Sequence, residues 1–153
     1  MMVRPATESD ANAVLSIDGG VLGTAEHASL VSRRIESGHC LVSESEGRVL
    51  GFATVHPRSF FGRDFIELLV VDTDFRRQGV ANALLGACAH RSTTPELFTS
   101  TNSSNLPMRN LLRKAQWLFS GELVGIDEGD PELVFYRSSE LKLFLSQSVH
   151  ETP

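Results

Sequence analysis

The fold of this chain follows from the stretch Phe65-Ile66-Glu67-Leu68-Leu69-Val70-Val71-Asp72-Thr73-Asp74-Phe75-Arg76-Arg77-Gln78-Gly79-Val80-Ala81-Asn82-Ala83-Leu84-Leu85. Its first seven residues are apolar except for Glu67 and rich in branched side chains, which predicts a strand covered on both faces. Residues 72–74 are turn formers. From Val80 onward apolar residues recur at helical spacing. Gly79 therefore lies where a buried strand passes through a short turn into a helix.

This turn has the chemistry of an anion site. The first turn of a helix leaves backbone N–H groups without partners and carries the positive end of the helix dipole, which suits a phosphate. Gly79 has no side chain to keep an anion away, and Arg76 and Arg77 add full positive charge. The alternative is that both arginines are solvated surface charges.

Composition limits the class of protein. The chain has 153 residues, 41% of them hydrophobic, and a net charge of −5. This length predicts one domain, over residues 1–137, followed by a tail at 138–153. The negative charge argues against a nucleic-acid or anionic-membrane partner. Because no apolar run is long enough for export or for a membrane span, we expect a cytoplasmic protein.

Metal and disulfide chemistry are not expected. Cys40 and Cys88 lie in apolar surroundings, with no second Cys or His at the spacing of a metal site. We expect both to be packed as small hydrophobic residues. The five histidines are scattered, and His56, the one nearest a substrate loop, is expected to be a surface or structural residue.

Turn residues and apolar periods predict a strand, two helices, three strands, a helix, a strand, a helix and two strands. The strands are expected at residues 3–6, 40–44, 48–55, 65–71, 96–101, 120–126 and 133–137, and the helices at 11–18, 25–37, from 80, and at 105–114. Gly19 and Gly20 are expected to end the first helix, and His56 to begin a loop. Apolar residues in the tail predict a short amphipathic helix.

The spacing Arg76-x-x-Gly79-x-Ala81 resembles the pyrophosphate-binding signature of the GNAT acetyltransferases, Arg/Gln-x-x-Gly-x-Gly/Ala. The predicted element order is also the order of that family. Residues 3–10, 47–53 and 102–117 look like its first strand and cap, its third strand and its segment after the fifth strand. The resemblance implies an α/β (α+β) fold, GNAT-like, with a central mixed, mostly antiparallel sheet of about seven strands and helices on both faces.

The same resemblance implies an N-acetyltransferase that moves the acetyl group of acetyl-CoA to a primary amine of a small molecule or peptide. The amine would attack the thioester directly in a ternary complex, without a covalent enzyme intermediate or a metal. The backbone of Leu69, Val70 and Val71 would pair with the pantetheine arm, the N–H of Leu69 facing the thioester oxygen. The pyrophosphate would be wrapped by Arg76, Arg77, Gln78, Gly79, Val80, Ala81 and Asn82.

Asn105 would hold the pantetheine or an ordered water in this family, but it could equally be an ordinary helix cap. Glu67 also has two interpretations. A carboxylate in a largely buried strand is costly unless it is paired or faces a cavity. It could be the general base that takes a proton from the amine, with its pKa raised by burial, or the ion-pair partner of Arg58, Arg63 or another nearby cation.

One departure from the family concerns the general acid. Many members carry a Tyr on the helix after the fifth strand, and the matching position here is Leu112, which cannot donate a proton. Tyr136, the only tyrosine, could replace it, although a half-buried strand Tyr is more often structural. A catalytically silent acyl-CoA-binding sensor or interaction module is therefore the alternative to an active enzyme.

The identity of the amine is not set by any motif. The acidic segment at residues 127–132 would favour a cationic acceptor, or it is simply a solvated turn. The apolar tail around Leu141 to Leu145 could pair with a second copy of the chain in a homodimer.

Overall fold

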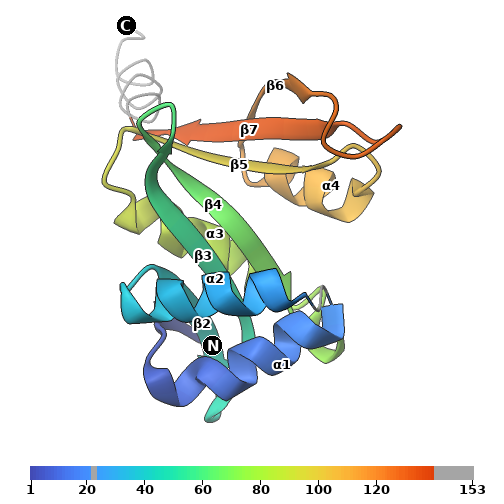
Figure 1. Cartoon of the computed structure of the whole chain (residues 1–153). Coiled ribbons are helices and arrows are strands. Elements are labelled where there is room, and N and C mark those ends of the chain that lie inside the picture. Colours follow the sequence, from blue (N-terminus) through green and yellow to red (C-terminus); the bar gives the residue numbers. More distant parts are fainter. Residues whose placement is uncertain (22–23, 140–153) are drawn as a thin grey trace, which may run out of the picture. The chain divides into compact units, whose positions relative to one another are not determined.

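The computed structural model describes residues 1–21 and 24–139 of the chain (Figure 1). Its elements, in chain order, are β1 (Met2–Pro5), the 3₁₀ helix η1 (Glu8–Asp10), α1 (Ala11–Val21), α2 (Ala25–Glu36), β2 (Cys40–Ser45), β3 (Arg48–Phe60), β4 (Arg63–Val71), the 3₁₀ helix η2 (Thr73–Phe75), α3 (Val80–Arg91), β5 (Glu96–Asn102), α4 (Leu106–Lys114), β6 (Leu118–Leu123) and β7 (Glu132–Ser138). The helix expected in the tail and the dimer contact at Leu141 to Leu145 lie outside the described residues.

The seven strands form one hydrogen-bonded sheet in the order β1-β2-β3-β4-β5-β7-β6. The pairs β1–β2, β2–β3, β5–β7 and β6–β7 are antiparallel. The chain divides into two compact units, of which the first comprises Met1–Pro57 with Ile66–Arg91, and the second Arg58–Phe65 with Ser92–Pro153. A single domain over residues 1–137 stays a prediction.

The first unit has helices on both faces of its strands (Figure 1). Phe52 of β3 is buried in one cluster with Val14 of α1 and Val31 of α2. Gly51, its neighbour on the same strand, faces Val80 of α3. Because successive residues of a strand point to opposite faces, α1 and α2 cover one face and α3 covers the other.

Gly51 allows α3 to approach the strands closely. A Cβ at this position would lie 2.8 Å from the Val70 carbonyl oxygen and 3.1 Å from Val80 Cγ1. No side chain fits at these distances, so only glycine brings the first turn of α3 onto β3 and β4 in this way. The local sequence predicted the helix start, and this contact sets its depth against the sheet.

The second unit contains β5, β7 and β6. Along β5, Leu97, Thr99 and Thr101 are buried, while Phe98 on the opposite face is half-buried. This alternation has the period of a strand with two different faces. In β6 a bulge between Phe119 and Gly121 interrupts the register with β7.

Asp64 fastens the hairpin of β3 and β4 to the segment that follows α3. Its carboxylate accepts hydrogen bonds from the N–H groups of Arg58 at 3.0 Å and Thr93 at 2.8 Å, and from the Ser92 hydroxyl at 3.2 Å. Burial alone would raise the pKa of Asp64, but the hydrogen bonds from Thr93, Arg58 and Ser92 outweigh it, and the pKa lies below its usual value.

Several expected element ends were wrong. The sixth strand, expected at residues 120–126, is β6 at Leu118–Leu123 and stops before Val124. The first helix runs through Gly19 and Gly20, because the buried Val14 and Ile17 hold it against the sheet and packing overrides the weak helix propensity of glycine. Strand β3 continues past His56 to Phe60. Arg58 lies within this strand with a positive φ of 52°, and its backbone N–H donates a hydrogen bond to the Asp64 carboxylate.

Candidate active site

The segment between β4 and α3 is a preformed turn. The Asp72 side chain accepts a hydrogen bond from the Asp74 N–H at 3.0 Å, and the Phe75 N–H donates to the Asp72 carbonyl at 2.9 Å. These bonds define the single turn η2. The turn residues quoted from the sequence therefore form the structure that their chemistry favours.

Arg48, at the start of β3, holds this turn in place. Its guanidinium Nη2 lies 3.1 Å from Asp72 Oδ2, and its Cζ lies 4.4 Å from the centre of the Phe75 ring. The Asp72 N–H also donates to the Leu50 carbonyl of β3 at 2.9 Å. No local motif marks Arg48 for this role, because the residue is 24 positions from Asp72.

The end of the turn opens toward solvent. Arg76, Arg77 and Gln78 are exposed, and the backbone of Arg77 and Gly79 has positive φ values of 59° and 83°. The first helical hydrogen bond of α3 runs from the Ala83 N–H to the Gly79 carbonyl at 3.0 Å. The N–H groups of residues 80–82 thus have no acceptor within the helix.

This turn has space for an anion. A Cβ on Gly79 would meet nothing within 4 Å. The open space lies beside the free N–H groups of the helix start and the two exposed arginines, an arrangement that can bind phosphate oxygens. The positive φ at Arg77, rare for a residue with a side chain, is the kind of backbone strain that clusters at binding sites.

Glu67 is paired on both carboxylate oxygens. Arg34 of α2 donates from Nε to Oε2 and from Nη2 to Oε1, each at 2.8 Å, and His56 Nδ1 lies 3.2 Å from Oε1. The carboxylate is 15% exposed and the Arg34 side chain 14%, whereas the His56 side chain is 48% exposed. The three side chains form a row, from the largely buried Arg34 through Glu67 to the exposed imidazole of His56.

The ion-pair interpretation of Glu67 is therefore confirmed, and its partner is Arg34. Hydrogen bonding to Glu67 outweighs burial and raises the pKa of Arg34, so this residue stays charged. Of the two partners named from the sequence, Arg63 pairs with Glu96 instead, at 2.9 Å. Arg34 was missed because it lies 33 residues away on a helix, and no sequence signal connects the two.

Leu69, Val70 and Val71 end β4 in the first unit, whereas Asn105, Leu112 and Tyr136 belong to the second. Asn105 caps α4, since its Oδ1 accepts from the Met108 N–H at 3.2 Å, so the helix-cap interpretation is confirmed. Leu112 is fully buried. Tyr136 of β7 stacks on Phe98 of β5, with ring centres 5.5 Å apart.

The acidic segment is built into the second unit by two of its carboxylates. Asp127 accepts from Asn102 Nδ2 at 2.7 Å, and Asp130 accepts from the Ser104 N–H at 2.9 Å and from the Ser104 hydroxyl at 2.6 Å. Both aspartates thus close the loop before β7 onto the end of β5. Glu128 is exposed.

Cys40 and Cys88 are free and buried, as expected, and burial raises the pKa of each thiol to about 12. Within residues 1–21 and 24–139 no group of three His, Cys, Asp or Glu side chains is placed to hold a metal ion. No helix in that part of the chain has the length and apolar character to cross a membrane.

A sheet in the order β1-β2-β3-β4-β5-β7-β6, with a positive-φ glycine turn between β4 and α3, defines the class of acyl-CoA N-acyltransferase folds. The sequence model of the acetyltransferase (GNAT) family matches residues 14–116. The chain belongs to the GNAT family. The predicted superfamily and fold are thereby confirmed, and membership supports an acyl-transferring enzyme that uses acetyl-CoA.

Solved structures agree with this assignment. A GNAT-family acetyltransferase from Bacillus cereus is 31% identical, with a TM-score of 0.86 over 90% of this chain and 96% of that chain. The yncA protein of Salmonella typhimurium, solved with its cofactor acetyl-CoA, is 22% identical, with a TM-score of 0.73 over 90% and 93%. An aminoglycoside 6′-N-acetyltransferase complexed with coenzyme A is 11% identical, with a TM-score of 0.76 over 90% and 97%. No curated protein gives a significant match.

Proposed function

We propose that this protein is an N-acetyltransferase that transfers the acetyl group of acetyl-CoA to a primary amine in a ternary complex. The observation that carries the proposal is the open, positively charged turn at Gly79, at the start of α3, in a chain of the GNAT family. Acetyl-CoA, when bound, supplies the thioester carbonyl that the amine attacks.

The proposed cosubstrate contacts follow the turn. Arg76, Arg77 and Gln78 would hold the pyrophosphate by their side chains, and Gly79, Val80, Ala81 and Asn82 by their backbone N–H groups. The backbone of Leu69, Val70 and Val71 would bind the pantetheine arm. The side-chain oxygen of Asn105 caps α4. Its amide nitrogen would donate a hydrogen bond to the pantetheine or to an ordered water.

Proton removal is proposed for Glu67 together with His56. The amine arrives protonated and must lose a proton before it can attack. His56 is the exposed member of the row, and Glu67 contacts its Nδ1. Glu67 would take the proton through this imidazole or through water, and Arg34 would keep the carboxylate in one orientation.

Tyr136 is the proposed proton donor to the departing thiolate. Its ring stacks on the Phe98 ring, and this contact fixes the orientation of the phenol. The stacking uses the ring face and not the hydroxyl group, which is still able to donate a proton. Tyr136→Phe would keep the stacking and remove only the donor. A lower kcat with an unchanged affinity for acetyl-CoA would support the assignment.

The binding part of the proposal is tested by calorimetry with acetyl-CoA. We expect Arg76→Glu and Gly79→Asp to weaken binding at least tenfold, because each places a negative charge at the phosphate site. Arg113→Glu, the same change at an exposed position of α4, is the matched control and should bind normally. Equal affinity in all three variants would refute the site.

Release of free thiol over a panel of amines tests the reaction. Turnover that depends on the amine supports the transferase. The buried Leu112 favours the second candidate, a silent acyl-CoA-binding module, because it removes the proton donor from the position where many family members have one. Binding of acetyl-CoA without turnover of any amine would establish this second candidate.

Three further properties belong to the proposal. We propose a cytoplasmic location, which the two free thiols support, and which cell fractionation would test. A cationic acceptor is supported by the exposed carboxylate of Glu128. A homodimer would be tested by light scattering of the full chain.

A further inference from the structure

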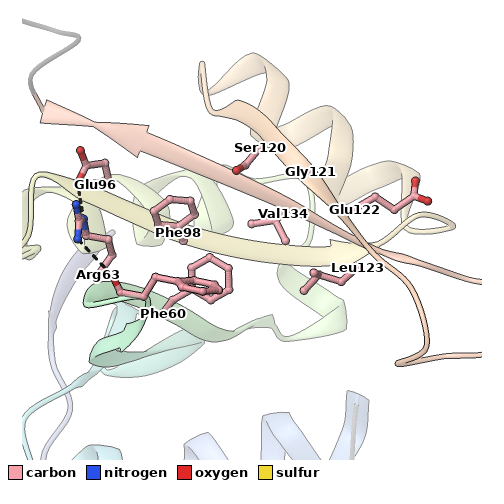
Figure 2. A pocket seen from close by; sticks show the side chains of 10 residues that line it. Phe60, Arg63, Glu96, Phe98, Ser120, Gly121, Glu122, Leu123 and Val134 are labelled. Carbon is pink, nitrogen blue, oxygen red and sulfur yellow. Dashed lines mark hydrogen bonds and ion pairs between the residues drawn. The ribbon is translucent and has the colours of Figure 1, made fainter.

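The second unit contains a cavity of about 520 Å³ that none of the proposed catalytic or cofactor residues lines. Its walls are mostly apolar. The rings of Phe60 and Phe98 stand on one side, and Leu123 and Val134 on the other (Figure 2). Phe61 also lines the cavity. A cavity of this size and composition suits a small organic molecule with an apolar body.

The rings are arranged as a continuous aromatic surface. Phe60 lies 5.0 Å from Phe98 and 5.1 Å from Phe61, measured between ring centres, and the contact with Phe61 is edge-on. Such spacing is favourable for aromatic pairs, and it leaves ring faces and edges for a further ring to pack against. The row continues from Phe98 to Tyr136.

Phe61 has an unusual backbone conformation and an unusual exposure for a phenylalanine. It occupies the hairpin turn between β3 and β4 with a positive φ of 49°, followed by Gly62 at 77°. Asn or Gly is usual at that first position, because bulky residues are strained there. The ring is also 89% exposed, the highest value among the large hydrophobic residues that the structure describes. A strained, exposed ring at the rim of an apolar cavity indicates a ligand contact.

The polar groups of the cavity stand at its ends. Arg63 and Glu96 form an ion pair of 2.9 Å at one end, and Ser120, the extra residue of the β6 bulge, lies in the wall (Figure 2). Glu122 adds a second carboxylate to the lining. With one cation and two anions the walls carry a net negative charge, and ring faces also attract cations. A protonated amine with an apolar body is complementary to both features.

The chain itself limits how far this cavity can be from the proposed proton acceptors. Phe60 follows His56 by four residues on β3, and Arg63 precedes Glu67 by four residues on β4. Four residues span at most about 14 Å even when fully extended, however the two units are arranged. Phe60 therefore lies at most about 14 Å from His56, and Arg63 at most about 14 Å from Glu67, measured between Cα atoms.

We infer that this cavity binds the apolar end of the acyl acceptor, and that the acceptor is a primary amine attached to an aromatic or similarly bulky apolar group. The inference rests on the proposed function, because it names the acceptor class for the same reaction. The Phe60, Phe61 and Phe98 rings bind the aromatic group, and the negative lining favours the ammonium.

The test compares 2-phenylethylamine with ethylamine and spermidine on the full chain. Thiol release should give a kcat/KM for 2-phenylethylamine at least tenfold above that for ethylamine, and above that for spermidine. Calorimetry without acetyl-CoA should show binding of 2-phenylethylamine only. A preference for spermidine, or equal kcat/KM values for the three amines, would overturn the inference.

Phe61→Asn separates ligand binding from folding. Asparagine suits the left-handed turn position, so the variant should melt at or above the wild-type temperature while its kcat/KM for 2-phenylethylamine falls about tenfold. Phe119→Asn is the matched control, because that ring is 60% exposed and does not line the cavity. Equal loss in both variants, or no loss in Phe61→Asn, would contradict the role of the rings.

Acetyl-CoA binding distinguishes the two proposals. Normal acetyl-CoA binding and turnover of other amines, without the preference for 2-phenylethylamine, refutes the acceptor class and leaves the transferase intact. Absence of acetyl-CoA binding refutes the proposed function. In that case, binding of 2-phenylethylamine by wild type that is weaker in Phe61→Asn still establishes the cavity as an aromatic amine site. If 2-phenylethylamine does not bind, the cavity is not such a site.

Discussion

Arg34 on α2 holds Glu67 on β4 by two hydrogen bonds of 2.8 Å, one to each carboxylate oxygen. Replacing Arg34 by Met should lower the free energy of unfolding by about 2–3 kcal/mol, since a largely buried carboxylate loses its charged partner. Urea unfolding measures this loss. The double variant Arg34→Met/Glu67→Met should recover most of it, because no unpaired charge remains. Equal stability of wild type and Arg34→Met would contradict the coupling.

Glu67→Gln addresses chemistry rather than folding. The amide keeps the size of the side chain but cannot take up a proton, so kcat should fall by about 10²–10⁴-fold if Glu67 is the base. Affinity for acetyl-CoA, measured by calorimetry, should not change. Glu44→Gln is the control, because Glu44 is likewise paired with an arginine, Arg4, but has no place in the proposed proton transfer or in the cavity. An unchanged kcat in Glu67→Gln would leave Glu67 with only its ion-pair role.

Gly79→Ala is expected to destabilise the protein by about 1 kcal/mol. The cause is conformational, because φ is 83° at this position while the added Cβ would meet nothing within 4 Å. Gly86→Ala, within the helix that follows Gly79, is the matched control, with equal space and no positive φ, and it should stabilise by about 0.5–1 kcal/mol. Thermal melts of both variants would show shifts of opposite sign. A stabilising Gly79→Ala would be inconsistent with the left-handed turn.

Gly51→Ala should cost about 1–3 kcal/mol through overpacking. The added methyl group would lie 2.8 Å from the Val70 carbonyl oxygen of β4 and 3.1 Å from the Val80 side chain of α3, so both elements must shift away from β3. Weaker acetyl-CoA binding should accompany the lower stability, because the Gly79 turn begins that helix. Adding Val80→Ala relieves only the side-chain contact, and we expect a partial rescue at most. Full rescue would mean that the backbone contact is unimportant.

Stability should fall in acid through two aspartates. The hydrogen bonds from Arg4 outweigh burial and lower the pKa of Asp10 to about 2. A carboxylate with a depressed folded pKa stabilises the protein above its unfolded pKa, and this contribution disappears as the pH falls toward the folded pKa. Asp10 should therefore contribute about 2 kcal/mol at neutral pH and lose it between about pH 4 and pH 2.

Asp64, whose pKa also lies below its usual value, should act in the same direction. Urea unfolding of Asp10→Asn and Asp64→Asn at pH 7 and at pH 3 would test both. Each variant should be less stable than wild type at pH 7 and differ less from it at pH 3. Glu128→Gln removes an exposed carboxylate and should match wild type at both values. A constant difference across the pH range would refute the linkage.

Local signals in the sequence were sufficient for the elements around the Gly79 turn. The strand, turn and helix of residues 65–85 were predicted because apolar period, turn chemistry and the start of helical spacing at Val80 are all properties of neighbouring residues. The same kind of signal correctly placed α2 and the cap at Asn105. Element ends were less predictable. Helix α1 continues through Gly19 and Gly20, although glycine has a low helix propensity in an isolated helix.

The sequence by itself determined the family, the order of the elements and the basic turn that would hold coenzyme A, since each is encoded within short stretches of chain. Only the tertiary structure decided the environment of Glu67, because its partners Arg34 and His56 come from two other elements. It also decided that Leu112 is buried and that Phe60, Phe61 and Phe98 gather around one cavity. Contacts between distant residues depend on the packing of helices against strands, which no local pattern of residues specifies.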